Sequence, residues 1–304
     1  MSDTDLINKL KEIAGDGNVL CDEPMSKHTT FKAGGAARFF VTIPHEESLK
    51  SMVPYLQSTG LPFFLAGKGS NLLVSDKGYD GVILRLGSGF ERISFSGNEV
   101  TAGAAASLIS LAAAAADRGF SGLEFASGIP GSVGGAVFMN AGAYGGEICQ
   151  CLKDAEILFL DGSTEHCSAE DLKLSYRYSC LKDRPGCVIK AMFTLNEDDP
   201  EMIRGRMEEY KKKRLEKQPL EYPSAGSTFK RPEGFFAGKL ISDAGLSGEH
   251  VGDAYVSEKH CGFIVNKGNA TATDIHQLMV RVQSRVKEYT GVTLEPEVIM
   301  LGEF

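Results

Sequence analysis

The residues most suggestive of chemistry lie between Gly122 and Gly146, where the sequence reads GLEFASGIPGSVGGAVFMNAGAYGG and contains eight glycines. This segment has too few large side chains to be stabilised mainly by packing. Clustered glycines indicate a main chain that takes positive φ or closely approaches a neighbour. Backbone N–H groups in such turns bind phosphate and other anions. Ser127, Ser132 and Asn140 add small polar groups with no evident role in a core. We therefore expect a flat-ringed, phosphorylated ligand here; the alternative is a run of tight turns in a β-rich domain.

A second glycine turn, GKGSN, occupies residues 67–71. It is not a Rossmann fingerprint, because Leu72 stands where G-x-G-x-x-G requires its third glycine. It is not a Walker A loop either, because Lys68 is followed by Gly69 instead of Ser or Thr. Two separate turns, 67–71 and 128–135, both able to offer backbone N–H groups, suit an elongated ligand with a diphosphate centre, such as a flavin dinucleotide.

Composition and charge argue against several classes of protein. The net charge of −8 over 304 residues disfavours a nucleic-acid partner. The sequence contains no run of eighteen apolar residues, so we expect no membrane span. The seven cysteines are odd in number and lack a C-x-x-C framework, which favours a reducing cytoplasm and no metal site. The acidic N-terminus, MSDTDLINKLKEI, does not resemble a basic signal peptide. We favour a monomer.

The elements that must position these turns follow from hydrophobic periodicity and from helix end signals. The first eighty-odd residues are typical of a small β-α-β unit that carries the 67–71 turn, and 218–236 is a loop rich in proline and glycine. Thr271 and Asp274 form a capping-box pattern at the start of the last helix. The pattern predicts helices at 3–14, 46–58, 107–118, 201–217 and 274–289, and strands at 37–43, 63–66, 72–74, 82–86, 100–102, 155–160 and 188–195.

Seven short motifs follow one another in a fixed order across residues 25–300. They are FKAGG (31–35), GKGSNLL (67–73), GIPGSVGGA (128–136), NAGAYG (140–145), SYRYS (175–179), AGSTFK (225–230) and LEPEV (294–298). Each motif alone is weak, but the ordered set closely resembles the UDP-N-acetylenolpyruvoylglucosamine reductases, also called UDP-N-acetylmuramate dehydrogenases. Arg177 and Ser227 are only fifty positions apart, so the chain resembles the short form of that family, which lacks a loop carrying an extra tyrosine.

The resemblance implies an α+β fold, with an FAD-binding part of the vanillyl-alcohol-oxidase or p-cresol-methylhydroxylase type and an additional α+β substrate-binding domain. The implied division is an N-terminal FAD-binding subdomain at 1–75 with 299–304, a second FAD-binding subdomain at 76–205, and a substrate-binding domain at 206–298. It also implies that FAD is bound by Gly67, Lys68, Gly69, Ser70, Asn71, Gly128, Pro130, Gly131, Ser132, Gly134, Gly135, Asn140 and Ala141.

The reaction implied by the resemblance has two halves. NADPH reduces FAD, and reduced flavin passes a hydride to UDP-N-acetylglucosamine enolpyruvate, giving UDP-N-acetylmuramate for peptidoglycan. Negative charge then builds beside the substrate carboxylate, so the site needs a cation and a proton donor. The matching positions assign Ser227 as the proton donor, Arg177 as the carboxylate clamp, and Glu297 as the residue that polarises the enol, with Glu295 as the alternative glutamate. Without the resemblance, these are a loop serine, a surface arginine and an exposed glutamate.

Further residues are expected around the substrate. Tyr176 and Lys230 belong to the matching motifs, and Lys230 is a candidate for supporting Ser227. The basic residues Arg214, Lys217 and Arg231 are candidates for the diphosphates of UDP or NADPH. His260 is interpreted as structural. Two other functions remain open at this level: a flavin oxidase or dehydrogenase acting on another substrate, and a binding module without catalysis.

Overall fold

The computed structural model describes residues 3–304, which form two compact units. Unit 1 comprises Met1–Cys21 (described from Asp3), Phe39–Gly67 and Gly81–Lys213, and unit 2 comprises Asp22–Arg38, Lys68–Asp80 and Arg214–Phe304. The chain therefore passes between the units several times. The three-part division expected from the sequence stays a prediction.

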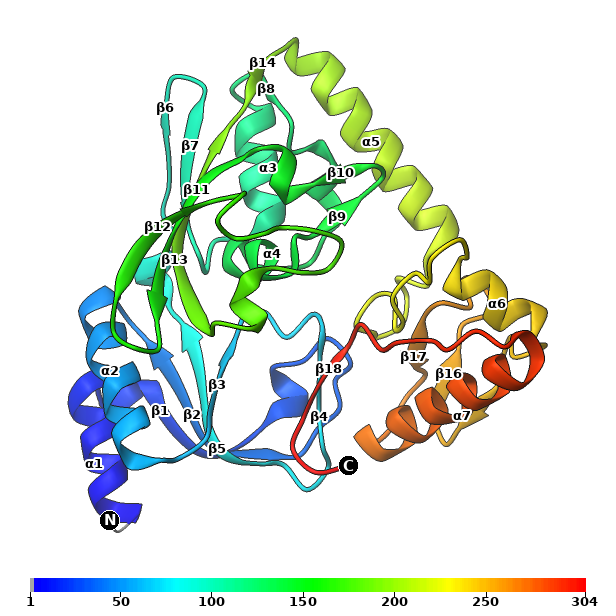
Figure 1. Ribbon diagram of the computed structural model, residues 1–304, viewed down its shortest axis with the longest axis horizontal. Coiled ribbons are helices and arrows are strands. Elements are labelled where there is room, and N and C mark those ends of the chain that lie inside the picture. Colours follow the sequence, from blue (N-terminus) through cyan, green and yellow to red (C-terminus); the bar gives the residue numbers. More distant parts are fainter. Residues whose placement is uncertain (1–2) are drawn as a thin grey trace. The chain divides into compact units, whose positions relative to one another are not determined.

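The first sheet has the strand order β1-β2-β5-β3, and its last two strands run parallel (Figure 1). Helices α1 and α2 contribute Leu10 and Met52 to the apolar core that this sheet shares, and Leu10 lies on the face of α1 expected from its periodicity. Helix α2 ends at Thr59, one residue beyond the predicted end, and Gly60 caps it in the left-handed conformation. The elements are α1 (Asp3–Ala14), α2 (Glu46–Thr59), β1 (Val19–Pro24), β2 (Ala36–Ile43), β3 (Phe63–Ala66) and β5 (Tyr79–Leu86).

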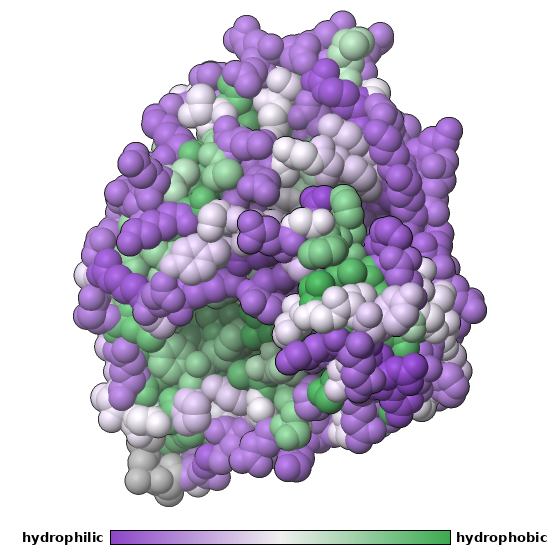
Figure 2. Space-filling model, turned by 45° about the vertical axis from the view of Figure 1, so that its right-hand side comes forward, coloured by the Kyte–Doolittle hydropathy of each residue, from purple (hydrophilic) through white to green (hydrophobic). Residues whose placement is uncertain are grey.

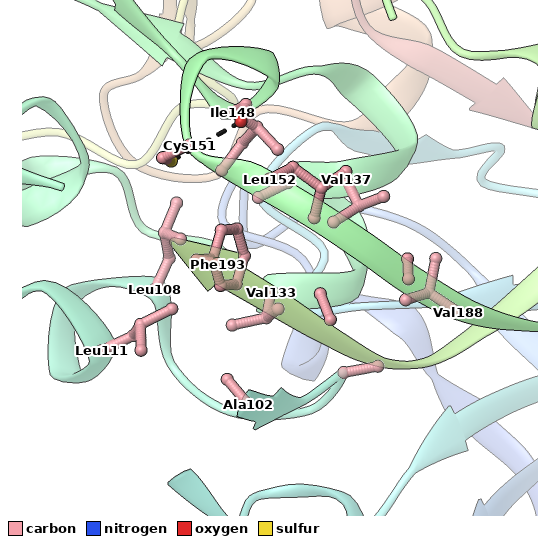
Figure 3. Packing of buried hydrophobic residues seen from close by; sticks show 14 of the residues in the cluster. Ala102, Leu108, Leu111, Val133, Val137, Ile148, Cys151, Leu152, Val188 and Phe193 are labelled. Carbon is pink, nitrogen blue, oxygen red and sulfur yellow. Dashed lines mark hydrogen bonds between the residues drawn. The ribbon is translucent and has the colours of Figure 1, made fainter. Parts of the chain in front are cut away.

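The second sheet lies within unit 1 and is antiparallel, in the order β12-β11-β13-β7-β6. Helices α3 and α4 pack on it, and Figure 3 shows Leu108, Val133 and Phe193 converging from α3, α4 and β13. This core holds the start of α4 in place, where the second glycine turn ends. The elements are α3 (Leu108–Ala116), α4 (Val133–Met139), β6 (Ile93–Ser96), β7 (Glu99–Gly103), β11 (Leu152–Phe159), β12 (Thr164–Ser168) and β13 (Gly186–Thr194).

Unit 2 contains a small antiparallel sheet covered by the long helix α7, which buries Ile275, Leu278 and Val282 as the sequence pattern predicts. The capping box of Thr271 and Asp274 at its start is confirmed. Strand β4 pairs in parallel with β18 near the C-terminus. The elements are α6 (Ala237–Asp243), α7 (Ala272–Thr290), β4 (Leu72–Val74), β15 (His250–Val251), β16 (Ala254–Val256), β17 (Ile264–Asn266) and β18 (Ile299–Leu301).

Helix α5 (Pro200–Lys217) is polar and mostly exposed, as predicted. Arg206 anchors its first half in unit 1: Nε and Nη2 donate to Glu124 Oε1 at 2.9 and 2.7 Å, and Nη2 also bonds Asp198 Oδ2 at 2.5 Å. The Arg206 pair holds the pKa of Asp198 below its usual range. The remaining short strands are β8 (Phe120–Ser121), β9 (Gly142–Ala143), β10 (Gly146–Glu147) and β14 (Asn196–Glu197).

Replacing Arg206 with alanine is expected to lower the free energy of unfolding by about 2 kcal/mol, because the Glu124 side chain, only 11% exposed, loses its cation. The loss is smaller than for a fully buried pair because the Arg206 side chain is 35% exposed. Urea unfolding measures it. Arg204→Ala removes a pair with Asp117 in which both side chains are more than half exposed, and should leave stability unchanged. Equal losses in the two variants would contradict the anchoring role of Arg206.

The α+β class expected from the sequence is confirmed. Hydrophilic side chains cover most of the face seen in Figure 2, with apolar surface gathered in a few patches. Over residues 3–304, no helix is both long and apolar enough to cross a membrane.

Candidate flavin and substrate site

The backbone of the turn at 67–71 is tightly constrained by its neighbours. Gly69 is buried with a φ of 65°, and a Cβ there would lie 1.9 Å from the carbonyl oxygen of His28. The Gly69 carbonyl is held from inside by Thr30, whose backbone N–H donates to it at 3.1 Å. Throughout the described chain, the backbone N–H groups of residues 68–71 donate to no other residue. A row of unused donors on a fixed turn fits an anionic group such as a diphosphate.

The turn at 128–135 differs from the open N–H cradle expected from its glycines. Most of its donors are used inside unit 1: those of Gly131, Val133 and Gly134 reach the carbonyls of Ile129, Ala106 and Ala104 at 2.9, 3.0 and 2.9 Å. The N–H of Gly135 reaches Ser132 Oγ at 3.3 Å. A Cβ on Gly134 would lie 2.9 Å from that of Ala104, so glycine here permits close packing. This turn therefore supplies a surface with few side chains, on which Pro130 and Gly135 are exposed.

Asn140 was expected at the flavin, but its side chain is fully buried and turned into unit 1. Its Nδ2 donates to Glu147 Oε2 at 3.0 Å and to the carbonyl of Ser175 at 3.1 Å, while Oδ1 accepts from the N–H of Cys149 at 2.9 Å. Ala141 is half-buried, and its N–H bonds the Ala136 carbonyl at 2.8 Å. The Asn140 amide thus has protein partners on both its nitrogen and its oxygen.

Arg177 lies in a tight turn of unit 1 in which Ser175 and Tyr178 exchange two backbone hydrogen bonds, of 3.2 and 3.0 Å. Arg177 has a φ of 55°, an uncommon conformation for a side chain of this size. Its Nη2 donates to the Gly142 carbonyl at 3.3 Å, and its Cζ lies 5.1 Å from the ring centroid of Tyr176, which is 46% exposed. The turn therefore presents a cation and an aromatic ring together.

Ser227 and Glu297 lie on two paired segments of unit 2. The N–H of Glu297 donates to the Thr228 carbonyl at 2.8 Å, and the N–H of Lys230 donates to the Glu295 carbonyl at 2.8 Å. Thr228 is fully buried, and its Oγ1 accepts from the N–H of Ile264 at 2.9 Å. Ser227 is half-buried, and its hydroxyl bonds no other residue of the described chain. The fold thus brings a hydroxyl that is open to a ligand and a carboxylate onto adjacent segments.

The two candidate glutamates differ in how they are held. The Glu295 side chain is 71% exposed, and its Oε2 lies 3.0 Å from Lys230 Nζ. Glu297 is half-buried, and its carbonyl accepts from Asn71 Nδ2 at 2.9 Å, so both its backbone groups are fixed. Because the Lys230 ammonium contacts Glu295, its expected support for Ser227 stays a prediction. Glu297 is thus the less exposed and more firmly held of the two glutamates, and its role stays a prediction.

The outer basic residues lie on α5 and the following loop. Arg214 and Lys217 are in the last turn of α5, and the exposed Arg231 has its Cζ 3.9 Å from the ring centroid of Phe236. Their assignment to a diphosphate stays a prediction. No cluster of His, Cys, Asp and Glu suited to a metal ion occurs in the part of the chain that the structure describes.

His260 bonds a backbone group two residues along the chain. Its Nδ1 accepts from the backbone N–H of Gly262 at 3.1 Å, and the carbonyl of Gly262 in turn accepts from the N–H of Thr228 at 2.8 Å. Burial lowers the pKa of His260 below its ordinary value, so the neutral ring serves as the acceptor. Sequence reasoning missed Thr30, which supports the 67–71 turn, because residue types alone do not show which backbone groups meet.

Comparison with known proteins agrees with these features. A model of FAD-binding domains matches residues 37–168, and a model described as the UDP-N-acetylenolpyruvoylglucosamine reductase C-terminal domain matches residues 218–301. The first match includes both glycine turns, and the second includes Ser227 and Glu297.

Full-length relatives and one solved structure extend the match to nearly the whole chain. A UDP-N-acetylenolpyruvoylglucosamine reductase of Lachnoclostridium phytofermentans is 50% identical over 302 residues, covering 98% of this chain and 97% of the relative. One from Caldanaerobacter subterraneus is 46% identical over 298 residues, covering 98% of both. The crystal structure of the Thermus caldophilus reductase superposes with a TM-score of 0.81 at 38% identity, covering 93% of this chain and 98% of that one. The chain therefore belongs to the UDP-N-acetylenolpyruvoylglucosamine reductase family and is an FAD-dependent oxidoreductase.

Proposed function

We propose that this chain uses NADPH to reduce UDP-N-acetylglucosamine enolpyruvate to UDP-N-acetylmuramate in the cytoplasm, as a step in peptidoglycan precursor synthesis. The observation that carries the proposal is the pairing of segments 228–230 and 295–297, which fixes Glu297 beside the segment of Ser227. The Ser227 hydroxyl has no partner within the described residues and so is available to a substrate.

The residues present fit FAD. The unused N–H donors of 68–71 would hold its diphosphate, and the side-chain-poor surface around Gly128, Pro130 and Gly135 would lie against the rest of the cofactor. When bound, FAD supplies the redox chemistry, taking a hydride from NADPH and giving one to the terminal carbon of the enolpyruvyl double bond.

The chain's own residues manage charge and protons. As the terminal carbon gains hydrogen, negative charge develops on the neighbouring carbon and spreads into the carboxylate. The Arg177 guanidinium, whose planar fork matches a carboxylate, holds that charge. Ser227 Oγ then donates its proton to the neighbouring carbon, and Glu297 orients the enolpyruvyl group. Tyr176 and Lys230 line the substrate, and Arg214, Lys217 and Arg231 bind the diphosphates of UDP or NADPH.

One experiment on the wild-type protein tests this function. Purified protein should be yellow, lose its flavin absorbance when NADPH is added without oxygen, and regain it when one equivalent of the enolpyruvyl sugar nucleotide follows. Rapid oxygen consumption with an alcohol, and no recovery with the sugar nucleotide, would instead indicate a flavin oxidase. Colourless protein that takes up no FAD would contradict a flavoenzyme altogether.

A further inference from the structure

We propose that Asn140 is a positioning residue for Arg177 and not a cofactor ligand: it locks the turn at 175–178 so that the Arg177 guanidinium meets the substrate carboxylate in one orientation. The inference deepens the proposed function and rests on the role of Arg177 given there. All the contacts that carry it lie within unit 1.

The position of Asn140 is unusual for a polar residue. Its exposed fraction is 0%, and it caps the C-terminal end of α4 with φ 42° and ψ 59°, in the left-handed region. Asparagine tolerates this conformation better than most residues, but glycine would adopt it at lower cost. Helix capping therefore explains the backbone at Asn140 and does not by itself require this side chain.

The side chain is explained by its partners. The two amide protons of Nδ2 reach Glu147 Oε2 at 3.0 Å and the Ser175 carbonyl at 3.1 Å, and Oδ1 accepts from the N–H of Cys149 at 2.9 Å. A buried amide with its donors and acceptor engaged by protein has little capacity left for a ligand. Removing it takes one donor from Glu147 Oε2, one of two donors from the Ser175 carbonyl, and the acceptor of the Cys149 N–H, which makes the set of contacts selective for asparagine.

The bond to Ser175 acts on Arg177 through the turn. The Ser175 carbonyl also accepts the N–H of Tyr178 at 3.0 Å, so Asn140 fixes the residue at which this turn starts. Within the turn, Arg177 has a φ of 55°, a strained conformation that persists only when its surroundings impose it. Ser179 Oγ bonds the Phe138 carbonyl at 2.7 Å just beyond the turn.

The guanidinium end is fixed by the same segment. Arg177 Nη2 donates to the carbonyl of Gly142, two residues after Asn140, at 3.3 Å. The residues from 140 to 142 therefore hold both the start of the turn and the tip of the Arg177 side chain. Loss of the Asn140 amide frees one of these two attachments and lets the fork reorient.

The test uses Asn140→Gly, which keeps the left-handed cap but removes the amide. With full FAD occupancy, reoxidation of the NADPH-reduced flavin by the enolpyruvyl substrate should slow by about 30-fold, because a misplaced clamp loses transition-state stabilisation. Flavin reduction by NADPH should change by less than about threefold. In the FAD-loaded protein without substrate, amide hydrogen exchange at 175–178 should accelerate at least about tenfold, which reports the freed turn independently of activity.

Two further variants keep the inference open to contradiction. Asn140→Asp provides a second test in case Asn140→Gly folds poorly. It is isosteric but places a carboxylate against Glu147 and the Ser175 carbonyl, so the same effects on reoxidation and hydrogen exchange are expected. Val188→Ala removes a buried side chain from the same unit without touching the turn, and should lower stability while leaving both half-reactions unchanged.

A double-mutant cycle separates this inference from the proposed function. In an Arg177→Ala background, Asn140→Gly should add less than about twofold to the loss, because the residue it positions is gone. Fully additive losses, or loss of FAD from Asn140→Gly while Val188→Ala retains it, would overturn the positioning role and leave the proposed function standing. If Arg177→Ala alone leaves reoxidation intact, the proposed role of Arg177 fails first.

Discussion

Replacing Ser227 with alanine is expected to slow reoxidation of the reduced flavin by the enolpyruvyl substrate about 10³-fold, while flavin reduction by NADPH stays within about twofold. The physical reason is that the two half-reactions differ in their proton demand. Hydride transfer from NADPH needs no proton donor on the protein. In the second half-reaction, the carbon next to the one that takes the hydride must receive a proton. Alanine at position 227 has no hydroxyl and therefore cannot donate that proton.

Stopped-flow absorbance without oxygen measures both rates in one preparation, because the oxidised flavin band falls in the first half-reaction and returns in the second. Ser224→Ala is the matched control, since Ser224 lies in the same loop and pairs with Val265 through its backbone. It should leave both rates unchanged. Equal slowing of both half-reactions in Ser227→Ala would remove Ser227 from the proton-donor role and point to disturbed folding of the loop.

Gly69→Ala is expected to weaken FAD binding at least about 100-fold, which corresponds to about 2.7 kcal/mol. A Cβ at this position would lie 1.9 Å from the His28 carbonyl oxygen, and that oxygen belongs to backbone that cannot rotate away. The added methyl must therefore push the 67–71 turn off His28 and break the bond between the Gly69 carbonyl and the N–H of Thr30. The unused N–H groups of 68–71 would then lose the arrangement in which we propose they bind the diphosphate.

Gly60→Ala separates this effect from backbone strain alone. Gly60 has a φ of 69°, close to the 65° of Gly69, but no atom lies within 4 Å of a Cβ built there. It should cost about 1 kcal/mol of stability and leave FAD affinity unchanged. Fluorescence titration of the apoproteins with FAD compares the two variants. Wild-type affinity in Gly69→Ala would contradict the assignment of this turn to the cofactor.

The sequence predicted local structure well because helix ends and apolar faces are encoded by neighbouring residues. Thr271 and Asp274 form the capping box of the last helix as expected, and α2 ends at Thr59, one residue beyond the predicted end. Strand β4 shows the limit. Its three residues carry no signal for a partner, and the partner is β18, more than two hundred residues away in the chain. Pairing over that distance is decided by the packing of the whole unit.

For the candidate site too, the sequence predicted residue types but not the contacts that hold them. The ordered motifs identified the family and the cofactor, and they predicted the roles of Arg177, Ser227 and Glu297, because chemistry restricts residue types at matching positions. The motifs did not show which atoms those residues meet. Glycine content predicted an N–H cradle at both turns, yet only 68–71 keeps its donors unused. Most donors of 128–135 bond groups inside unit 1, and those of Val133 and Gly134 reach the carbonyls of Ala106 and Ala104, which are distant in sequence.

What the sequence by itself determined is thus the set of elements, the family and the residue types that the reaction needs. Only the tertiary structure decided how each is held: Asn71 bonds the carbonyl of Glu297, 226 positions away, and Asn140 bonds that of Ser175, 35 positions away. An asparagine amide offers the same donors and acceptor in any fold. Its role therefore depends on which backbone carbonyl the packing of each unit brings within reach, and this is not written in the residues beside it.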